Sequence, residues 1–388
     1  MKKLFTILAL LLITLTTMGN DTTLTWDFTS LSEADNTLIS SDKNNNTDWT
    51  YNSNRYERTT APTGAPLTAG GEELAYTLGL NFSTSAATDD YRIYVYSQDN
   101  TKQKTKCYLI LNTATATLTI PGLKQNNTVS ITFRSNDKDE ERGISTISNA
   151  TLTSENGSNM SANSSTEKTA TYNMTADGDI TITPTKGIRI YSISVTTDHV
   201  IGKTTKTGYA TYSNANPLNL GAVNGGQVYY ASAASGNTVT MTNATGNVPA
   251  GEGLFVKGTA GQRFTIGVAS SGTAITDNLL KGQLTEVTVA KSATGANHYV
   301  FGYTSATDYG FYNLTSDTTV PVGKAYLELA DALGTGAKAN VVFNETTDIT
   351  NVKGENIKDN AVYNLSGMRV TKLTKGIYIK NGHKFIVK

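Results

Sequence analysis

The sequence predicts an all-β protein, and three observations favour this class. Threonine, asparagine, glycine, serine and tyrosine dominate the chain, and evidence for helices is nearly absent. Apolar residues alternate with polar ones instead of recurring at helical spacing, as in strands that bury one face. The alternating runs are short and are separated by polar turns, which is typical of β-sandwiches.

The chain is long enough for two or three domains. It has 388 residues, and a typical domain has roughly 100–200. A polar stretch at 197–207 lacks strong apolar alternation at its end, so we place a boundary there. We expect these segments: a signal peptide at 1–19, a β-sandwich at 20–197, a β-rich, sandwich-like accessory domain at 198–347, and a short C-terminal β cassette at 348–388.

The charge balance argues against polyanionic partners. The sequence has 32 basic and 32 acidic residues, so its formal net charge is zero, and only 16% of residues are charged. Nucleic acid and anionic membranes both require a basic patch, so we expect neither as a partner. A single cysteine, Cys107, permits no internal disulfide and no thiolate zinc site. It lies in an apolar run, where we expect a buried strand thiol.

The N-terminus has the features of a secretory signal peptide. Lys2 and Lys3 precede an apolar run at 4–15, and small residues follow near 17–19. The run is too short for a comfortable membrane span, and no other stretch is long enough. We therefore expect an exported chain without a transmembrane segment after cleavage.

Short alternating strands fill the first domain. We expect strands at 23–28, 91–96, 107–111, 116–120, 128–133, 150–153, 179–183 and 187–195. This pattern favours a β-sandwich of the jelly-roll or lectin-like kind, although strand order cannot be read from the pattern itself.

Three motifs add a family resemblance. The domain opens with Trp26-Asp27-Phe28, contains an Ile-Pro-Gly-Leu segment at 120–123, and closes with a strand at 188–193. In these features it resembles β-sandwich modules found beside pectate lyases and other secreted polysaccharide enzymes. The resemblance implies a lectin-like role in which the domain binds a polysaccharide or glycoconjugate.

The strand at 91–96 offers candidate sugar-binding residues. Alternation puts Arg92, Tyr94 and Tyr96 on one face, away from Tyr91 and its neighbours. Aromatic rings contact the C–H surface of a sugar, and planar polar groups bind its hydroxyls. The alternative is that these tyrosines pack against the opposite sheet or a long loop.

The two tryptophans are interpreted differently. Trp26 follows strand alternation and is expected in the core. Trp49 lies in a polar stretch beside Tyr51, and we take it as the candidate for exposed stacking on a sugar.

A polar stretch at 42–48 resembles a calcium loop only in part. Oxygen ligands stand at alternate positions, namely at Asp42, Asn44, Asn46 and Asp48. The stretch lacks the turn glycine and has Ser53 where a bidentate glutamate would complete the site. Calcium is thus a possible cofactor, and no other cofactor is expected. The acidic loop at 137–142 is expected to be a solvated turn, with a hydroxyl-binding loop as the alternative.

The second domain contains a short motif that occurs twice. A valine-proline turn with glycine two residues after the proline precedes an apolar strand at both 248–256 and 320–327. With further motifs across 207–349, the segment resembles a β-rich accessory module of secreted proteins. No activity follows from this resemblance.

The C-terminus reads as three short strands joined by two turns. Its landmarks are Tyr363, Gly367, Gly376, Tyr378 and Lys388. These resemble the sorting domain of type IX secretion substrates, which implies export machinery as a partner and a secreted or outer-surface location. The cassette is shorter than the usual domain, so periplasmic residence is the alternative.

No catalytic constellation emerges from the sequence. The histidines fall in three different segments, and no nucleophile elbow or phosphate loop is present. We therefore expect a non-catalytic, carbohydrate-binding protein. The alternatives are a structural or adhesive surface protein, and a polysaccharide-active enzyme that uses two loop carboxylates.

Overall fold

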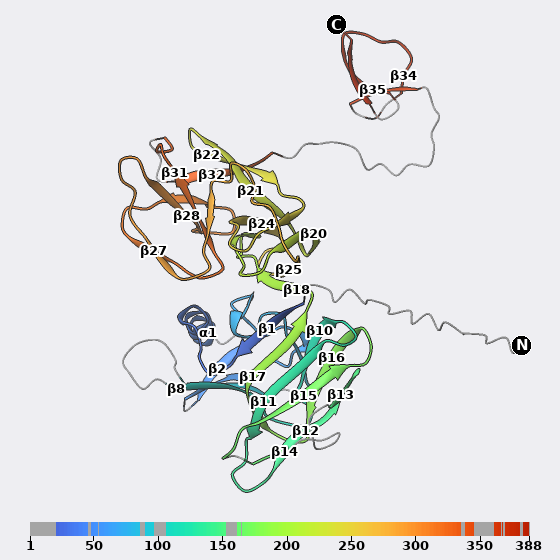
Figure 1. The fold of residues 1–388 in the computed structure, drawn as a ribbon, viewed down its shortest axis with the longest axis vertical. Coiled ribbons are helices and arrows are strands. Elements are labelled where there is room, and N and C mark those ends of the chain that lie inside the picture. The colour runs from blue at the N-terminus through green and yellow to red at the C-terminus, as the bar shows by residue number, and fades with distance from the viewer. Residues whose placement is uncertain are drawn as a thin grey trace, which may run out of the picture. The chain divides into compact units, whose positions relative to one another are not determined.

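The computed structural model describes residues 21–45, 48–52, 54–85, 90–96, 106–152, 161–163, 165–334, 338–344, 361–365, 367, 369–380 and 383–387. The chain divides into two compact units, residues 1–343 and 344–388, which are described separately. Antiparallel strands make up nearly all regular structure of the described residues, so the all-β prediction is confirmed (Figure 1). No described helix has the length and apolar character needed to cross a membrane.

The first sandwich faces a nine-stranded sheet against a six-stranded one. The larger sheet runs in the order β13-β15-β11-β17-β9-β8-β3-β2, with β1 also paired to β17. Its strands are β1 (Thr22–Asp27), β2 (Trp49–Asn52), β3 (Arg55–Arg58), β8 (Tyr91–Tyr96), β9 (Lys106–Leu111), β11 (Thr128–Ser135), β13 (Ala150–Leu152), β15 (Lys168–Met174) and β17 (Ile188–Thr197).

The smaller sheet runs in the order β14-β12-β16-β10-β7-β4. Its strands are β4 (Thr63–Ala65), β7 (Asn81–Ser83), β10 (Thr117–Leu123), β12 (Arg142–Ile147), β14 (Ser161–Ala162) and β16 (Gly178–Pro184). The short pair β5 (Thr68–Ala69) and β6 (Glu72–Glu73) and the 3₁₀ turn η1 (Ala75–Thr77) complete this part of the chain.

Alternation along the strands builds one core between these sheets. In β11, Val129, Ile131 and Phe133 are fully buried, while the residues between them face outward. In β8, Tyr91 and Ile93 point inward in the same way. Burying each such side chain stabilises the fold by about 1.5–3 kcal/mol.

One helix, α1 (Glu33–Asn45), was not expected. Ser32 caps it, since the N–H of Asp35 donates to Ser32 Oγ at 3.1 Å. Its buried positions are Asp35, Ile39 and Asp42, which lie on one helical face. Because two of these three are carboxylates, the apolar periodicity that normally indicates a helix is missing.

Two further sheets form the second half of the larger unit. A four-stranded sheet has the order β18-β25-β20-β23, and a nine-stranded sheet has the order β19-β24-β21-β22-β32-β29-β28-β31-β26. The strands of the first are β18 (His199–Lys203), β20 (Leu218–Asn224), β23 (Asn247–Val248) and β25 (Arg263–Val268). Those of the second are β19 (Tyr209–Tyr212), β21 (Gly226–Ser235), β22 (Thr238–Asn243), β24 (Leu254–Gly258), β26 (Leu280–Gly282), β28 (Asn297–Tyr303), β29 (Tyr309–Asn313), β31 (Ala325–Leu329) and β32 (Lys338–Asn344). A separate pair joins β27 (Val287–Val289) to β30 (Thr318–Val320).

The echoed valine-proline motifs form matching turns. The N–H of Glu252 donates to the carbonyl of Pro249, and the N–H of Lys324 donates to that of Pro321, both at 3.3 Å. Gly251 adopts a positive φ of 82°, as the glycine of the second copy also does. Both turns precede an apolar strand, β24 in one case and β31 in the other.

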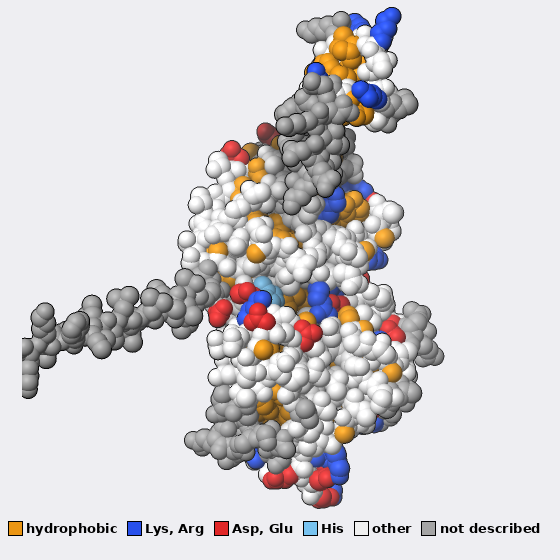
Figure 2. Space-filling view, turned by 90° about the vertical axis from the view of Figure 1, so that its right-hand side faces the viewer, with side chains coloured by type: hydrophobic (Ala, Val, Ile, Leu, Met, Phe, Trp, Pro, Cys, Tyr) orange, Lys and Arg blue, Asp and Glu red, His pale blue; other side chains and the backbone are white. Residues whose placement is uncertain are grey.

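An ion pair between a half-buried arginine and a buried glutamate joins the two sandwiches. Arg263 in β25 lies 3.0 Å from Glu73, and its Nη1 donates to the carbonyl of Gly79 at 2.8 Å. Its Nη2 also donates to Asn81 Oδ1 at 2.9 Å. Gly79 has a φ of +96°, and a Cβ there would lie 2.6 Å from Ile201 Cδ1, so only glycine fits. Figure 2 shows charged side chains gathered at this junction on a face that is otherwise mostly uncharged.

The C-terminal unit is a small four-stranded sheet in the order β34-β33-β35-β36. Its strands are β33 (Val362–Asn364), β34 (Arg369–Val370), β35 (Gly376–Lys380) and β36 (His383–Val387). Tyr378 is buried, and its ring lies 5.9 Å from that of Phe385. Tyr363 is half-buried in β33, and Gly367 has a φ of 75°. Lys388, the last landmark, lies outside the described residues.

Candidate binding face

Three arginines of the first sandwich lie in one row across the outer side of its larger sheet. The strand register places Arg92 opposite Ile110, Ile110 opposite Arg189, and Arg189 opposite Arg134. These strands are β8, β9, β17 and β11, which are neighbours in the sheet. Side chains on this side alternate with the core residues, so the row faces away from the hydrophobic interior.

Three tyrosines form a parallel row beside the arginines. Tyr94 stands opposite Tyr108, and their rings stack with centroids 4.6 Å apart at an interplanar angle of 2°. Tyr191 lies next to Tyr108 with a centroid distance of 5.6 Å. The register of β17 against β11 shifts at this residue, which is the signature of a β-bulge.

The two rows interlock through cation–π contacts. The Cζ of Arg189 lies 5.1 Å from the centre of the Tyr108 ring, and that of Arg134 lies 5.2 Å from the Tyr191 ring. Such contacts are worth about 0.5–1 kcal/mol at partly exposed sites. They hold the guanidinium groups against the rings and so fix their positions on the sheet.

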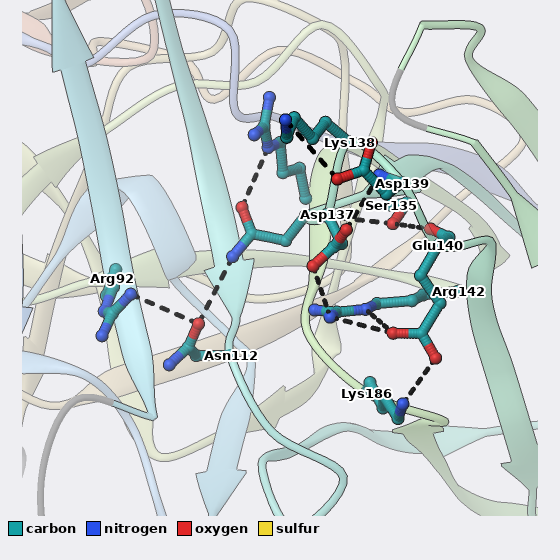
Figure 3. A network of polar contacts seen from close by, with 11 residues as sticks. Arg92, Asn112, Ser135, Asp137, Lys138, Asp139, Glu140, Arg142 and Lys186 are labelled. Carbon is teal, nitrogen blue, oxygen red and sulfur yellow. Dashed lines mark hydrogen bonds and ion pairs between the residues drawn. The ribbon is translucent and has the colours of Figure 1, made fainter.

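Two asparagines link the arginines into a chain of hydrogen bonds (Figure 3). Arg92 Nη1 and Asn136 Nδ2 both donate to Asn112 Oδ1 at 3.3 Å. Arg189 Nε donates to Asn136 Oδ1 at 3.0 Å. We define the arginine–tyrosine face as Arg92, Arg134, Arg189, Tyr94, Tyr108, Tyr191, Asn112 and Asn136.

Carboxylates neutralise only part of this face. Glu57 lies 3.5 Å from Arg92 and also contacts Arg55, while Glu167 lies 2.8 Å from Arg134. Within the part of the chain that the structure describes, Arg189 forms no ion pair with a carboxylate. The side chains of Arg92 and Arg134 retain exposed fractions of 17% and 28%, so the row is reachable from solvent.

Tyr108 stays protonated at neutral pH. Burial raises the pKa of Tyr108 to about 12, a rise that Arg189 opposes in part. A neutral phenol both donates and accepts hydrogen bonds. The row therefore offers hydroxyl groups beside guanidinium donors.

The acidic loop at 137–142 borders the face and pairs with itself (Figure 3). Arg142 lies 2.8 Å from Asp137 and 3.0 Å from Glu140, and Lys186 also contacts Glu140. A hydrogen bond from the backbone N–H of Asp139 lowers the pKa of Asp137, and the contact with Lys186 lowers that of Glu140. Both carboxyls are thus ionised at neutral pH, with their charges already paired.

Two of the three residues chosen from the strand at 91–96 fall on this face. Arg92 and Tyr94 point outward, and Tyr94 stacks on Tyr108 instead of packing against the opposite sheet. The side chain of Tyr96 lies outside the described residues.

Trp49 does not belong to the face, and the expectation of an exposed indole is wrong. The side chain is fully buried in β2, and its Nε1 donates to the carbonyl of Thr68 at 2.8 Å. Arg58 covers the ring at 5.4 Å. The polar residues around Trp49 in the sequence belong to a helix and an edge strand, and the indole fills the space beneath them.

The predicted calcium ligands serve other contacts where the structure describes them. Asp42 accepts backbone N–H groups from Asp48, Trp49 and Gly70 at 2.9–3.1 Å. Asp48 lies 3.3 Å from Arg58. The side chains of Asn44 and Asn46 lie outside the described residues. No group of three or more histidine, cysteine, aspartate or glutamate side chains comes together among the residues described.

Sequence reasoning missed most of the arginine–tyrosine face. Tyr108, Tyr191, Arg189 and Arg134 each occupy an outward position of an alternating strand, so their direction could have been read. The sequence could not show that these residues are neighbours, because that depends on the pairing of β9 with β17 and of β17 with β11.

Comparisons with known proteins give no family assignment. No protein-family model matches the chain, and no curated protein matches it significantly.

Proposed function

We propose that the first sandwich binds carbohydrate through the arginine–tyrosine face, and that the protein acts without catalysing a reaction. The observation that carries this proposal is the contiguity of three kinds of group on one outward sheet surface. Rings, guanidinium groups and amides lie on neighbouring strands. These are the groups that recognise the C–H surfaces and hydroxyls of sugars.

The geometry supports contact along a strip of the sheet. Because Tyr94 and Tyr108 stack on each other, each covers one face of its neighbour. A sugar then meets ring edges and phenol hydroxyls, with the Asn112 and Asn136 amides one row further on. A strip of this kind suits an extended polysaccharide better than a single enclosed sugar.

The full mature chain, screened on a glycan array and then titrated by calorimetry, tests this proposal. We expect Tyr108→Ala to weaken binding about tenfold or more, since its ring-edge and hydroxyl contacts are lost and Tyr94 loses its stacking partner. Tyr51→Ala is the matched control, because Tyr51 is 44% exposed and stands opposite the inward-facing Tyr56. An array without any neutral or acidic hit would contradict the proposal and favour a structural or adhesive role.

We also propose that the protein is exported and reaches the outer surface, with the periplasm as the alternative. The apolar N-terminal segment and the cassette-like C-terminal residues support delivery. The C-terminal unit has its own small sheet. Export machinery could therefore bind it without unfolding the sandwiches.

A further inference from the structure

We infer that the ligand of the arginine–tyrosine face is an acidic polysaccharide, whose carboxylate or sulfate groups are bound by Arg189 and Arg134. This inference rests on the proposed carbohydrate-binding function and adds the charge of the ligand. It does not follow from overall composition, because the chain has a formal net charge of zero.

The first argument is the local excess of positive charge. Arg134 and Arg189 stand opposite each other on this face, and among the residues that the structure describes only Arg134 has a carboxylate partner, Glu167. One carboxylate cannot neutralise two guanidinium groups. An anionic ligand would supply the missing charge.

The second argument is the supply of unused donors. Arg189 donates through its Nε to Asn136 Oδ1 at 3.0 Å. Among the described residues, nothing accepts from its terminal nitrogens. Arg134 Nη2 donates to Glu167 at 2.8 Å, and none of the described residues accepts from its Nη1, although the side chain is 28% exposed. A planar guanidinium binds carboxylate or sulfate oxygens in a bidentate manner, and such charge-assisted bonds are about twice as strong as neutral ones.

The third argument is spacing. Arg134 and Arg189 stand directly opposite each other on paired strands, which are about 4.8 Å apart, and Arg92 lies two strands beyond Arg189. A polymer whose acidic groups repeat along its length can contact several of these arginines at once. Simultaneous contacts raise the overall affinity above that of any single one.

Titration calorimetry of the full mature chain with paired polymers tests the inference. The probes are alginate and carboxyl-reduced alginate, and dextran sulfate and dextran. We expect at least one charged polymer to bind about tenfold or more tightly than its neutral counterpart, with an affinity that falls as salt is added. The two pairs distinguish carboxylate from sulfate recognition.

Variants that remove the arginine charges test whether the preference for the charged polymer arises at Arg134 and Arg189. The double change Arg134→Gln and Arg189→Gln should abolish the preference for the charged polymer, and each single change should reduce it. Lys124→Gln is the control, because Lys124 is an exposed lysine of the same domain with a 56% exposed side chain, paired with Asp177. Melting temperatures of all variants verify that each remains folded.

Two outcomes would overturn the inference while leaving carbohydrate binding intact. One is equal affinity for charged and neutral polymers, unchanged by the arginine substitutions. The other is an equal loss in Lys124→Gln, which would indicate diffuse attraction instead of a defined site. If no glycan of either kind binds, the proposed function itself fails.

Discussion

Asp42 shows how a single polar residue can serve the fold from a buried position. Its carboxylate is 3% exposed and accepts N–H groups from three backbone positions. Those donors hold the start of β2 and the β5 end against helix α1. The same oxygens were predicted from the sequence as calcium ligands, because spacing alone cannot distinguish an oxygen that binds metal from one that binds backbone.

Replacing Asp42 with asparagine should destabilise the protein by about 1–3 kcal/mol, since an amide NH₂ would face backbone N–H donors. Urea unfolding measures the loss, and Ser41→Ala at the exposed neighbouring position serves as control. Adding calcium to the wild-type protein should leave its melting temperature unchanged. A calcium-dependent rise that disappears in Asp42→Asn would instead establish a metal site.

Tyr108 gives the arginine–tyrosine face a distinctive pH dependence. Burial raises its pKa from 10.0 to about 12. The folded state therefore keeps the phenol proton after the unfolded state has lost it, so this tyrosine's contribution to stability is complete below pH 10 and is lost as the pH rises towards 12.

The Tyr108→Phe variant should consequently lose less stability than the wild type across that interval. Urea unfolding at matched pH values measures the difference, and ultraviolet absorbance of the phenolate verifies that one late-titrating tyrosine is gone. Tyr51→Phe is the comparison for an exposed ring. An identical alkaline decline in wild type and Tyr108→Phe would contradict the burial argument.

At the scale of elements, the end of one strand couples the two sandwiches. Arg263 begins β25 and reaches Glu73 in β6 and the backbone of Gly79. The Glu73 side chain is only 2% exposed, and burial raises its pKa, although Arg263 lowers it in part. A carboxylate in this position is costly to the fold unless the arginine stays beside it.

Arg263→Ala should destabilise the chain by about 3 kcal/mol, because it leaves the Glu73 carboxylate buried without its ion-pair partner. We expect calorimetry to show one unfolding transition in the wild type and two in the variant, as the sandwiches separate. Adding Glu73→Gln to Arg263→Ala should recover part of the loss by removing the buried charge. A single, unshifted transition in Arg263→Ala would show that other contacts hold the junction.

At the scale of the whole molecule, the C-terminal unit forms a small sheet of its own. Residues 344–388 form a compact unit of their own, and the core clusters of the sandwiches contain only earlier residues. Deleting 344–388 should therefore leave the melting temperature and the glycan affinity unchanged.

The same deletion should remove the protein from the cell surface, if this unit serves export. Fractionation of cells that express the full and shortened chains measures the location, and calorimetry of the purified proteins measures binding. Glycan affinity that falls with the deletion would place part of the site in the C-terminal unit.

Much of the architecture could be predicted from the sequence because strand alternation is a local property. The alternation in β8 correctly separated inward-facing Tyr91 from outward-facing Arg92 and Tyr94. The glycine turns of the second half were equally readable, since positive φ is demanded by the turn itself.

Helix α1 and the burial of Trp49 could not be read in this way. The buried face of the helix is mostly carboxylate, and those carboxylates are tolerated only because distant backbone N–H groups satisfy them. Trp49 is buried for a related reason, since its indole N–H finds an acceptor on a strand far along the chain.

The sequence by itself determined that this protein is all-β and, within the strands predicted from alternation, which side chains share a face. Only the tertiary structure decided that Tyr108, Arg189 and Arg134 are neighbours, because sheet order brings together strands that lie far apart in the chain. Direction depends on the two-residue period of a strand, whereas adjacency depends on long-range pairing. A binding surface requires both.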